Sequence, residues 1–426
     1  MLDPKYIRDN IEAVEANIRN RNMHADARAV VRLYDQRSQA IQELEQLRAR
    51  RNETAQQMKT KLDDAERQQL IEEGKQLKSR IPELEQRLKE TEAELTAEVE
   101  RIPNMIHPDA PVGTGEEANR EIKRVGAIPE FDFSPKDHVE LGTQLDLLDF
   151  ETATRVSGTK FYYLKNEAVF LELALCRYAL DALRKHAFVP MITPDIAREE
   201  VVAGIGYNPR GPETNIYSLE DGDGCLVGTA EITLGGYLSG QIMEPESLPI
   251  RLAGISHCFR KEAGAAGQFS KGLYRVHQFT KVEMFVYCLP EQSDALLEEL
   301  RAIEEEIFTT LEIPFRVVDT CSGDLGAPAY RKYDLEAWMP GRGDGGEWGE
   351  ITSTSNCTDY QARRLGVRYR DGNTRRFVHM LNGTAIAISR ALIALLENFQ
   401  QADGSVRIPA PLIPYTGFDR IAPREP

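Results

Sequence analysis

Apolar residues recur with a seven-residue rhythm in two series near the start of the chain. This spacing places one apolar stripe along each of two helices, which can pack on each other because a short polar link separates them. The pattern predicts an antiparallel coiled-coil hairpin over about 27–102, preceded by a short helical segment within residues 1–25. The stripe residues are Val30, Leu33, Ala40, Leu44, Leu47, Thr54 and Met58 in the first series, and Leu70, Gly74, Leu77, Ile81, Leu84, Leu88, Thr91, Leu95 and Ile102 in the second.

Polar residues and a proline modify this predicted hairpin at three points. Arg37 and Arg51 interrupt the first apolar stripe. Asp63 or Asp64, in the turn sequence 62–66, can accept hydrogen bonds from the first free amides of the second helix. Pro82 lies inside the second helix, where its ring removes a donor and crowds the previous turn, so a kink or a weakened hydrogen bond is expected there.

Shorter helix and strand patterns follow the hairpin, after three prolines within 103–111. A helix is expected from Lys165 to near His186, followed by an edge strand over 189–194 that contains two prolines. The predicted fold class is α+β, with a helical arm over 1–110 and a second domain over 111–426 in which helices flank an antiparallel β-sheet. One face of the 165–186 helix is expected to carry Val169, Leu173, Cys176, Leu180 and Leu183.

Composition and charge narrow the class of protein. The chain has 426 residues, 41% of them hydrophobic and 28% charged, which is ordinary for a soluble protein of more than one domain. A net charge of −16 argues against a general polyanion binder, although a local basic stripe can still contact phosphates. No apolar run approaches the ~20 residues that span a bilayer, so no membrane partner is expected.

The six cysteines stand apart, without a CxxC pair or a histidine at ligand spacing. Neither a structural zinc site nor a disulfide framework is therefore expected, and a reducing cytoplasm fits best. The first residues also lack the apolar core of a signal peptide and the composition of a transit peptide.

The stretch 251–287 carries the most informative set of polar residues. β-prone segments at both ends enclose a glycine-rich excursion over 263–267 and Gly272, which predicts two strands joined by a long loop. Guanidiniums, carboxylates and an aromatic ring on such a hairpin suit a nucleoside triphosphate and a small cationic ligand. For any one of these residues alone, an ordinary hairpin with a solvated polar face is the alternative. The side chains expected to face a cleft are Arg260, Glu262, Arg275, Gln278, Phe279 and Glu283.

The segments FRKE and RVHQFTKVE, with the glycine loop between them, resemble motif 2 of the class II aminoacyl-tRNA synthetases, in the form found in the seryl-tRNA synthetase family. The resemblance implies a ligase that joins L-serine to ATP as seryl-adenylate and then transfers the seryl group to tRNA(Ser) and, by family, to tRNA(Sec). It places Arg260 on the α-phosphate and Phe279 against the adenine. The remaining ATP-binding positions in this motif would be Lys261, Glu262, Arg275 and Val276.

The segment Thr229-Ala230-Glu231 resembles the TxE element that lies over the amino-acid site of this family. The resemblance implies that Glu231 accepts the serine ammonium and that Glu283 receives the serine hydroxyl. A buried acceptor that alanine or glycine leaves unpaired carries a desolvation penalty, which selects serine. Arg260, Asn382 and Thr384 complete the implied serine site.

The segment 349–358 resembles the family's GEISSxSN strand. Glu350 and Ser353 would bind the Mg²⁺ that bridges the triphosphate, with Ile351 and Thr352 beside the ATP. Residues three apart point to opposite faces of a regular strand, so a twist or bulge is needed to aim both ligands at one ion. A capped polar strand is the alternative.

The segment 379–390 resembles motif 3, in which Arg390 pairs with the γ-phosphate. The implied catalytic set is therefore Arg260, Glu283 and Arg390.

The predicted hairpin resembles, in architecture, the arm that holds the long variable arm of tRNA(Ser) in this family. Interspersed glutamates leave a simple solvated coiled coil as the alternative. The segment 165–194 resembles motif 1, which implies a homodimer, although a core helix and an edge strand explain its periodicity equally well. The candidate tRNA-binding residues of the hairpin are Arg48, Arg51, Lys59, Lys61, Lys75 and Lys78.

Motif 3 departs from the common bacterial pattern, because Thr384-Ala385 replaces Ser-Gly and Ser389 replaces the glycine before the arginine. The added bulk suggests an inhibitor-tolerant second copy of the enzyme. Other segments resemble the organellar and related bacterial branch of the family.

Two other functions stay open. The first is activation of an amino acid for a carrier protein. The two heptad series argue against it, because relatives with that function lack the long arm. The second is a non-enzymatic RNA-binding relative with a decayed site, and the intact set Arg260, Glu283, Glu350 and Arg390 argues against that.

Overall fold

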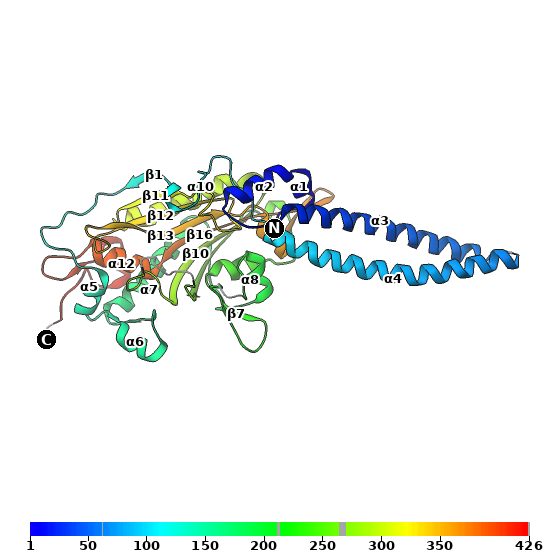
Figure 1. Ribbon diagram of the computed structural model, residues 1–426. Helices are drawn as coiled ribbons and strands as arrows, with labels where there is room; N and C mark the ends of the chain where they lie inside the picture. Colours follow the sequence, from blue (N-terminus) through cyan, green and yellow to red (C-terminus); the bar gives the residue numbers. More distant parts are fainter. Residues whose placement is uncertain (62, 211–213, 264–269, 425–426) are drawn as a thin grey trace. The chain divides into compact units, whose positions relative to one another are not determined.

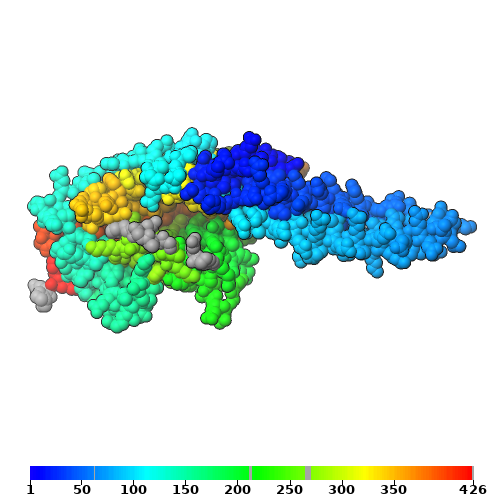
Figure 2. Space-filling model, viewed as in Figure 1, coloured from blue at the N-terminus to red at the C-terminus, as the bar shows by residue number. Residues whose placement is uncertain are grey.

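The computed structural model describes residues 1–61, 63–210, 214–263 and 270–424. The chain folds into two compact units, Met1–Met105 and Ile106–Pro426. The first unit contains α1 (Pro4–Asp9), α2 (Ile11–Asn20), α3 (Ala27–Gln57) and α4 (Asp64–Arg101). Helices α3 and α4 lie side by side as the long hairpin that the heptad pattern predicts (Figures 1 and 2).

The apolar stripes of α3 and α4 meet in the seam of the hairpin. Burying these side chains is the main source of stability for helices of this kind, because helix propensity alone contributes little. Nearer the start and end of the hairpin, Val30 and Val99 join a second cluster with residues of α1 and α2. The seam cluster consists of Ala40, Leu44, Leu77, Ile81 and Leu84, with Leu47 and Leu88 packed against it.

The second helix of the hairpin starts with the predicted cap. The Asp63 side chain accepts a hydrogen bond from the Glu66 amide at 2.8 Å, and the Glu66 carboxylate accepts one from the Asp63 amide at 3.2 Å. This reciprocal pair satisfies two amides that lack helical partners. Leu62, the first residue of the predicted turn, lies outside the described residues. Helix α4 continues through Pro82 to Arg101.

Ion pairs connect the two helices of the hairpin. Arg37, which interrupts the first stripe, pairs with Glu92 of α4 at 2.9 Å. Such exposed pairs contribute little free energy, but they fix which residues of the two helices face each other. The other cross-hairpin pairs are Arg48–Glu85 at 2.7 Å, Arg50–Glu73 at 2.5 Å and Arg80–Glu43 at 2.5 Å.

An eight-stranded sheet forms the centre of the second unit (Figure 1). All neighbouring strands are antiparallel except β4 and β9, which are parallel. The α+β prediction is therefore confirmed. In spatial order the strands are β1 (Arg120–Val125), β11 (Phe315–Asp319), β12 (Arg331–Met339), β13 (Glu347–Asn356), β16 (His379–Ala387), β10 (Gln278–Cys288), β9 (Ile250–Phe259) and β4 (Val189–Ile192).

Helices and small sheets surround this central sheet. Among the described residues, no helix is both long enough and apolar enough to cross a membrane. The helices are α5 (His138–Gln144), α6 (Phe150–Ser157), α7 (Glu167–Lys185), α8 (Glu199–Ile205), α9 (Ala230–Gly236), α10 (Ser293–Thr310), α11 (Tyr360–Leu365), α12 (Ile388–Asn398) and α13 (Ile413–Thr416). The small-sheet strands are β2 (Leu148–Asp149), β3 (Tyr163–Leu164), β5 (Ile196–Arg198), β6 (Tyr217–Ser218), β7 (Gly224–Leu226), β8 (Ile242–Met243), β14 (Arg368–Asp371), β15 (Thr374–Phe377), β17 (Val406–Arg407) and β18 (Arg420–Ile421).

Alternate residues of β10 face two different environments. Val282 and Met284 pack in the core formed with α7, α10 and α12. Phe285 and Tyr287 point to the opposite face, where they pack in a second core with α9. Because side chains alternate along a strand, Glu283 shares this second face and continues the row of Phe285 and Tyr287. The sheet therefore presents polar residues just beyond the edge of an apolar core.

Three strands of the sheet contain an extra residue, which is Ile122 in β1, and two of these strands line the site. In the pairing of β12 with β13, Leu335 faces Thr352 and Glu336 faces Glu350, so Ile351 is the additional residue. In the pairing of β10 with β16, Val282 faces Ile386 and Glu283 faces Thr384, so Ala385 is additional. A bulge of this kind reverses the facing of the residues that follow it. The bulges of β13 and β16 lie beside the polar residues described next.

Helix α7 differs from its sequence-based description. It begins at Glu167 and its buried side includes Leu171, Leu175 and Leu183, whereas Val169 and Leu173, predicted on the apolar face, are 41% and 62% exposed. The sequence pattern cannot separate these sides, because apolar residues occupy both. The exposed side of α7 therefore carries apolar surface that this chain does not cover.

Candidate active site

Two adjoining hollows open on the face of the sheet that carries Glu283. We call them the acidic hollow, of about 360 Å³, and the arginine hollow, a narrower space of about 50 Å³. Arg260, Lys281, Glu350 and Thr384 line both. The acidic hollow is also lined by Tyr207, Glu231, Glu283, Lys332, Ser353 and Asn382, and the arginine hollow by Glu262, Tyr274, Arg275, Val276, Phe279, Ile351, Thr352, Ser389 and Arg390.

Glu283 lies in the wall of the acidic hollow with only 2% of its side chain exposed, and it forms an ion pair with Lys281 of the same strand. The Thr229 hydroxyl donates to Glu283 Oε2 at 3.3 Å, and the Lys281 ammonium donates to Thr384 Oγ1 at 3.4 Å. A buried carboxylate requires such partners, because an isolated buried charge is costly. The hollow therefore holds a fixed acceptor that can receive one more hydrogen-bond donor.

Glu231 forms a second carboxyl group of this hollow. Its Oε1 accepts hydrogen bonds from the side-chain amides of Gln361 at 2.8 Å and Asn382 at 3.0 Å, and its Oε2 accepts from the Tyr207 hydroxyl at 3.2 Å. Burial, followed by the nearby negative charge of Glu283, raises the pKa of Glu231 from 4.5 to about 7. A cationic ligand would lower this pKa again, since it stabilises the carboxylate.

The arginine hollow contains guanidiniums that each have a carboxylate or carbonyl partner. Arg275 pairs with Glu262 at 3.2 Å, and Arg390 pairs with Glu350 at 3.1 Å. Arg260 donates to the Gly228 carbonyl at 3.2 Å and lies 5.3 Å from the ring centroid of Phe279. Burial raises the pKa of Glu350, but the charges of Arg390, Lys332 and Arg260 outweigh it and hold this pKa below its ordinary value. Glu350 therefore stays ionised.

The bulge at Ile351 brings Glu350 and Ser353 to the same side of β13. Ile351 and Thr352 are buried, at 1% and 2% exposure, while Glu350 and Ser353 both line the acidic hollow. These hard oxygen donors suit Mg²⁺, which takes few protein ligands and retains phosphate oxygens and water. In the described part of the chain, no group of three or more acidic, histidine or cysteine side chains forms a site for a metal held by the protein alone.

Four predicted residues do not line either hollow. Thr229 is buried and reaches the site only through its hydrogen bond to Glu283. Lys261 lies 5.7 Å from the centroid of the Tyr217 ring and is exposed. Ala230 is fully buried and approaches the backbone of Gly254, which pairs with Glu283. Gln278 belongs to a separate hollow with His257 and Glu172. Residues 264–267 of the predicted glycine-rich excursion lie outside the described residues.

Several residues that the sequence analysis did not single out complete the site. Lys281 could have been found from strand parity, since it lies two positions before Glu283 and so on the same face. Tyr207, Gln361 and Lys332 come from distant segments, and no local pattern marks them. Their placement follows only from the packing of α8, α11 and β12 around the central sheet.

Family models match both units of the chain. Residues 1–106 match the seryl-tRNA synthetase N-terminal domain, and residues 217–399 match the tRNA synthetase class II core domain (G, H, P, S and T). A serine–tRNA ligase of Treponema denticola is 65% identical over 422 residues, which cover 99% of this chain and 100% of that protein.

The chain belongs to the seryl-tRNA synthetase family. The seryl-tRNA synthetase of Pyrococcus horikoshii, solved as a complex with ATP, is 41% identical, with a TM-score of 0.93 and full coverage of both chains. The cytoplasmic serine–tRNA ligase of Naegleria fowleri, solved as a complex with AMP, is 32% identical, with a TM-score of 0.89 and coverage of 100% and 99%.

Within this seryl-tRNA synthetase family member, the three bulkier motif 3 residues occupy different environments. Thr384 lines both hollows and Ser389 lines the arginine hollow. Ala385 is the extra residue of the β16 bulge and is fully buried in the core on the other face. Only two of the three departures therefore add bulk next to the site.

Proposed function

We propose that this protein is a serine–tRNA ligase that converts L-serine and ATP to seryl-adenylate and pyrophosphate, and then transfers the seryl group to tRNA(Ser) and tRNA(Sec). The observation that carries the proposal is the pair of adjoining hollows: one has two buried carboxyl groups, and the other has three guanidiniums. A small zwitterion with a hydroxyl group fits the first, and a triphosphate fits the second.

The acidic hollow supports a specific arrangement of serine. Glu231 accepts hydrogen bonds from the ammonium group, and Glu283 accepts one from the side-chain hydroxyl. Alanine and glycine leave Glu283 with an unmet acceptor, which costs binding free energy. Thr229 and Asn382 hold the two carboxylates in place through the hydrogen bonds given above.

The arginine hollow supports binding of ATP. Arg260 contacts the α-phosphate, Arg390 contacts the γ-phosphate, and Phe279 stacks on the adenine. Glu262, Arg275, Val276, Ile351 and Thr352 line the same space. Lys261, whose side chain lies outside it, is a weaker candidate.

Glu350 and Ser353 are the residues that would hold Mg²⁺ in this site. The ion, when bound with ATP, supplies charge compensation for the phosphates.

The chemical steps require no side-chain nucleophile. A carboxylate oxygen of serine attacks the α-phosphorus, and the bond from that phosphorus to the oxygen bridging to the β-phosphorus breaks, so that oxygen leaves with pyrophosphate. A hydroxyl of the terminal ribose of tRNA then attacks the serine carbonyl, and AMP leaves. The protein contributes alignment of these groups and fixed positive charge, both of which lower the activation free energy.

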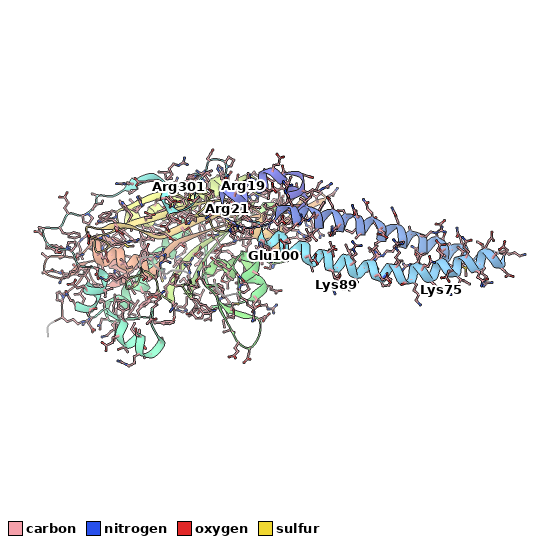
Figure 3. All side chains as sticks on the ribbon, in the orientation of Figure 1. Arg19, Arg21, Lys75, Lys89, Glu100 and Arg301 are labelled. Carbon is pink, nitrogen blue, oxygen red and sulfur yellow. The ribbon has the colours of Figure 1, made fainter. Side chains whose placement is uncertain are left out.

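The hairpin supports tRNA as the acceptor. Arg51, Lys59, Lys61 and Lys78 are exposed on it, as is Lys75, which extends from α4 (Figure 3). Arg48 is also a candidate, although it already pairs with Glu85. Contact of these cations with the phosphates of the long variable arm would release counterions and strengthen binding.

Exposed apolar residues support a homodimer. Phe170 and Leu173 on α7 are 57% and 62% exposed, and Val189 and Ile192 on the edge strand β4 are 56% and 87% exposed. A second copy that covers this surface would remove it from water, which is favourable.

A cytoplasmic location accords with the proposed ligase function.

Amino-acid-dependent exchange of labelled pyrophosphate into ATP tests the proposal. We expect exchange with serine, and much less with threonine, alanine or cysteine. Charging of purified tRNA(Ser) should follow. Serine-dependent exchange with transfer to a carrier protein, and none to tRNA, would instead identify a biosynthetic ligase, and absence of exchange would identify an RNA-binding relative.

A further inference from the structure

The ring of Tyr274 is in contact with two guanidiniums. The Cζ atoms of Arg342 and Arg390 each lie 4.8 Å from its centroid, within the range in which an aromatic ring attracts a cation. Tyr274 is 8% exposed, so its position is fixed by packing. One buried ring therefore holds an arginine of motif 3 and an arginine of the 341–346 segment next to the same space.

Arg342 lines a third hollow, of about 500 Å³, which we call the outer hollow. This hollow adjoins the arginine hollow, because both are lined by Tyr274, Arg275, Glu350 and Arg390. Arg342 thus lines a polar space that adjoins the arginine hollow, and it shares the Tyr274 ring with Arg390. A group that leaves the arginine hollow past Arg390 enters the space that Arg342 lines.

The surrounding residues restrict the Arg342 side chain. Its Nε donates to Glu347 Oε2 at 3.0 Å, and its side chain is 18% exposed. Its Nη1 also approaches the backbone of Gly349, where an added Cβ would lie 2.7 Å from that nitrogen. Any side chain at position 349 would displace the guanidinium, so glycine here preserves the placement of Arg342.

We propose that Arg342 is a pyrophosphate-binding residue, and that Tyr274 positions it together with Arg390. This inference rests on the proposed function and deepens it, since pyrophosphate is the product of the activation step. Arg342 contacts the β- and γ-phosphates as they separate from the adenylate. Its planar fork of donors suits a phosphate group better than a lysine ammonium would.

The charges of the site are consistent with this role. Each of the three arginines has a glutamate partner. The pairs are Arg275–Glu262, Arg342–Glu347 and Arg390–Glu350. The guanidiniums are therefore held in place before ligand arrives, and a polyphosphate, which carries more charge than a carboxylate, can compete for them. Three preplaced guanidiniums along one path supply fixed donors for pyrophosphate over its full length.

The matched variants Arg342→Gln and Arg316→Gln test the inference. Arg316 also lines the outer hollow, but it does not line the arginine hollow, and it pairs with Glu336 and Glu121 at 2.6 and 3.3 Å. Isothermal titration of the full chain with magnesium pyrophosphate measures binding directly. We expect Arg342→Gln to weaken pyrophosphate binding by about tenfold or more, the usual effect of removing a charge-assisted hydrogen bond, and Arg316→Gln to change it by less than about twofold.

A second readout separates binding from a general structural defect. In the exchange assay, Arg342→Gln should raise KM for pyrophosphate while KM for serine stays within about twofold, and Arg342→Lys should restore part of the loss. Three results would overturn the inference. The original chain and Arg342→Gln would bind pyrophosphate equally, Arg342→Gln and Arg316→Gln would weaken binding equally, or Arg342→Gln would lose affinity for serine and pyrophosphate in parallel. Pyrophosphate binding that depends on Arg342 without any serine-dependent exchange would overturn the proposed function and leave this inference standing.

Discussion

Lys281 and Glu283 lie two residues apart on β10 and form an ion pair with side-chain exposures of 7% and 2%. Each charge is therefore buried with the other as its main partner. Removing one member leaves an uncompensated buried charge, which commonly costs about 3–5 kcal/mol, whereas replacing both with apolar residues costs much less. The pair thus links the stability of the second unit to the chemistry of its site.

We therefore predict that Lys281→Met lowers the free energy of unfolding by about 3 kcal/mol. The double variant Lys281→Met/Glu283→Leu should recover most of this loss of stability. Serine activation should nevertheless be abolished in the double variant, because the acceptor for the serine hydroxyl is gone. Urea denaturation of the original chain, the two single variants Lys281→Met and Glu283→Leu, and the double variant measures the difference. Additive losses in the double variant would show that the two side chains do not depend on each other.

We predict that Glu231 makes the binding of serine dependent on pH. Its pKa of about 7 means that the carboxylate, the form that accepts from an ammonium, becomes populated as pH rises through 7. We predict that the dissociation constant for serine falls by up to about tenfold per pH unit below this pKa and levels off above it. Titration calorimetry between pH 6 and 8 measures it, and Glu231→Gln should flatten the profile.

The same group has the opposite effect on stability. Because folding raises its pKa from 4.5 to about 7, the folded chain binds this proton more tightly than the unfolded chain. The resulting contribution is fully present below pH 4.5 and is lost as pH rises through 7. A ligand-free chain should therefore show a Glu231-dependent loss of stability across this window, which comparison with Glu231→Gln isolates.

The bulge at Ile351 predicts unequal roles for two serines of β13. Ser353 lies beside Glu350 after the bulge. Ser355 also lines the acidic hollow, but it lies two residues farther along the strand, where it pairs with Asn382 of β16. We expect Ser353→Ala to raise the Mg²⁺ concentration for half-maximal exchange by several-fold, and Ser355→Ala to leave it nearly unchanged. Electron paramagnetic resonance of bound Mn²⁺ gives a readout that does not depend on turnover. Equal shifts in the two variants would contradict the assignment of Ser353.

The motif 3 residues predict how bulky seryl-adenylate analogues bind. Ser389 lines the arginine hollow, while Ala385 is buried in the core on the other face. We expect Ser389→Gly to tighten binding of an enlarged analogue by roughly tenfold, the scale of one small group in a pocket wall. Ala385→Gly is the matched control and should have little effect on affinity. Inhibition constants measured with serine at a fixed multiple of KM decide between them, and an equal gain from both would argue against tolerance through bulk.

The sequence predicted the need for the bulge in β13 but not its position. Oxygen ligands three residues apart cannot share one face of a regular strand, so an irregularity had to lie between Glu350 and Ser353. Which residue is extra depends on pairing with β12, and Ile351 is extra because it packs into the core. Strand register is a property of two segments and cannot be obtained from one.

The motifs identified the family and most of the lining residues, but periodicity misassigned one side of α7. Val169 and Leu173 recur at helical spacing with residues that are buried, and only the position of the neighbouring sheet shows that they are exposed. Periodicity reports that a face is apolar, and it does not report what covers that face. For the same reason Tyr207, Gln361 and Lys332 could not be assigned to the site, because tertiary packing alone brings them there.

The distribution of apolar contacts along the hairpin makes its far end easier to open than its base. Leu44 and Leu77 belong to the seam cluster, whereas between Leu47 and Leu70 the described side chains bury only Thr54 on α3. Local opening is governed by how much apolar surface must be exposed, so amide hydrogens near the tip should exchange with solvent at a lower free-energy cost than those near Val30 and Val99. In the proposed tRNA-binding role, the hairpin would therefore be rigid near Val30 and Val99 and compliant near its tip.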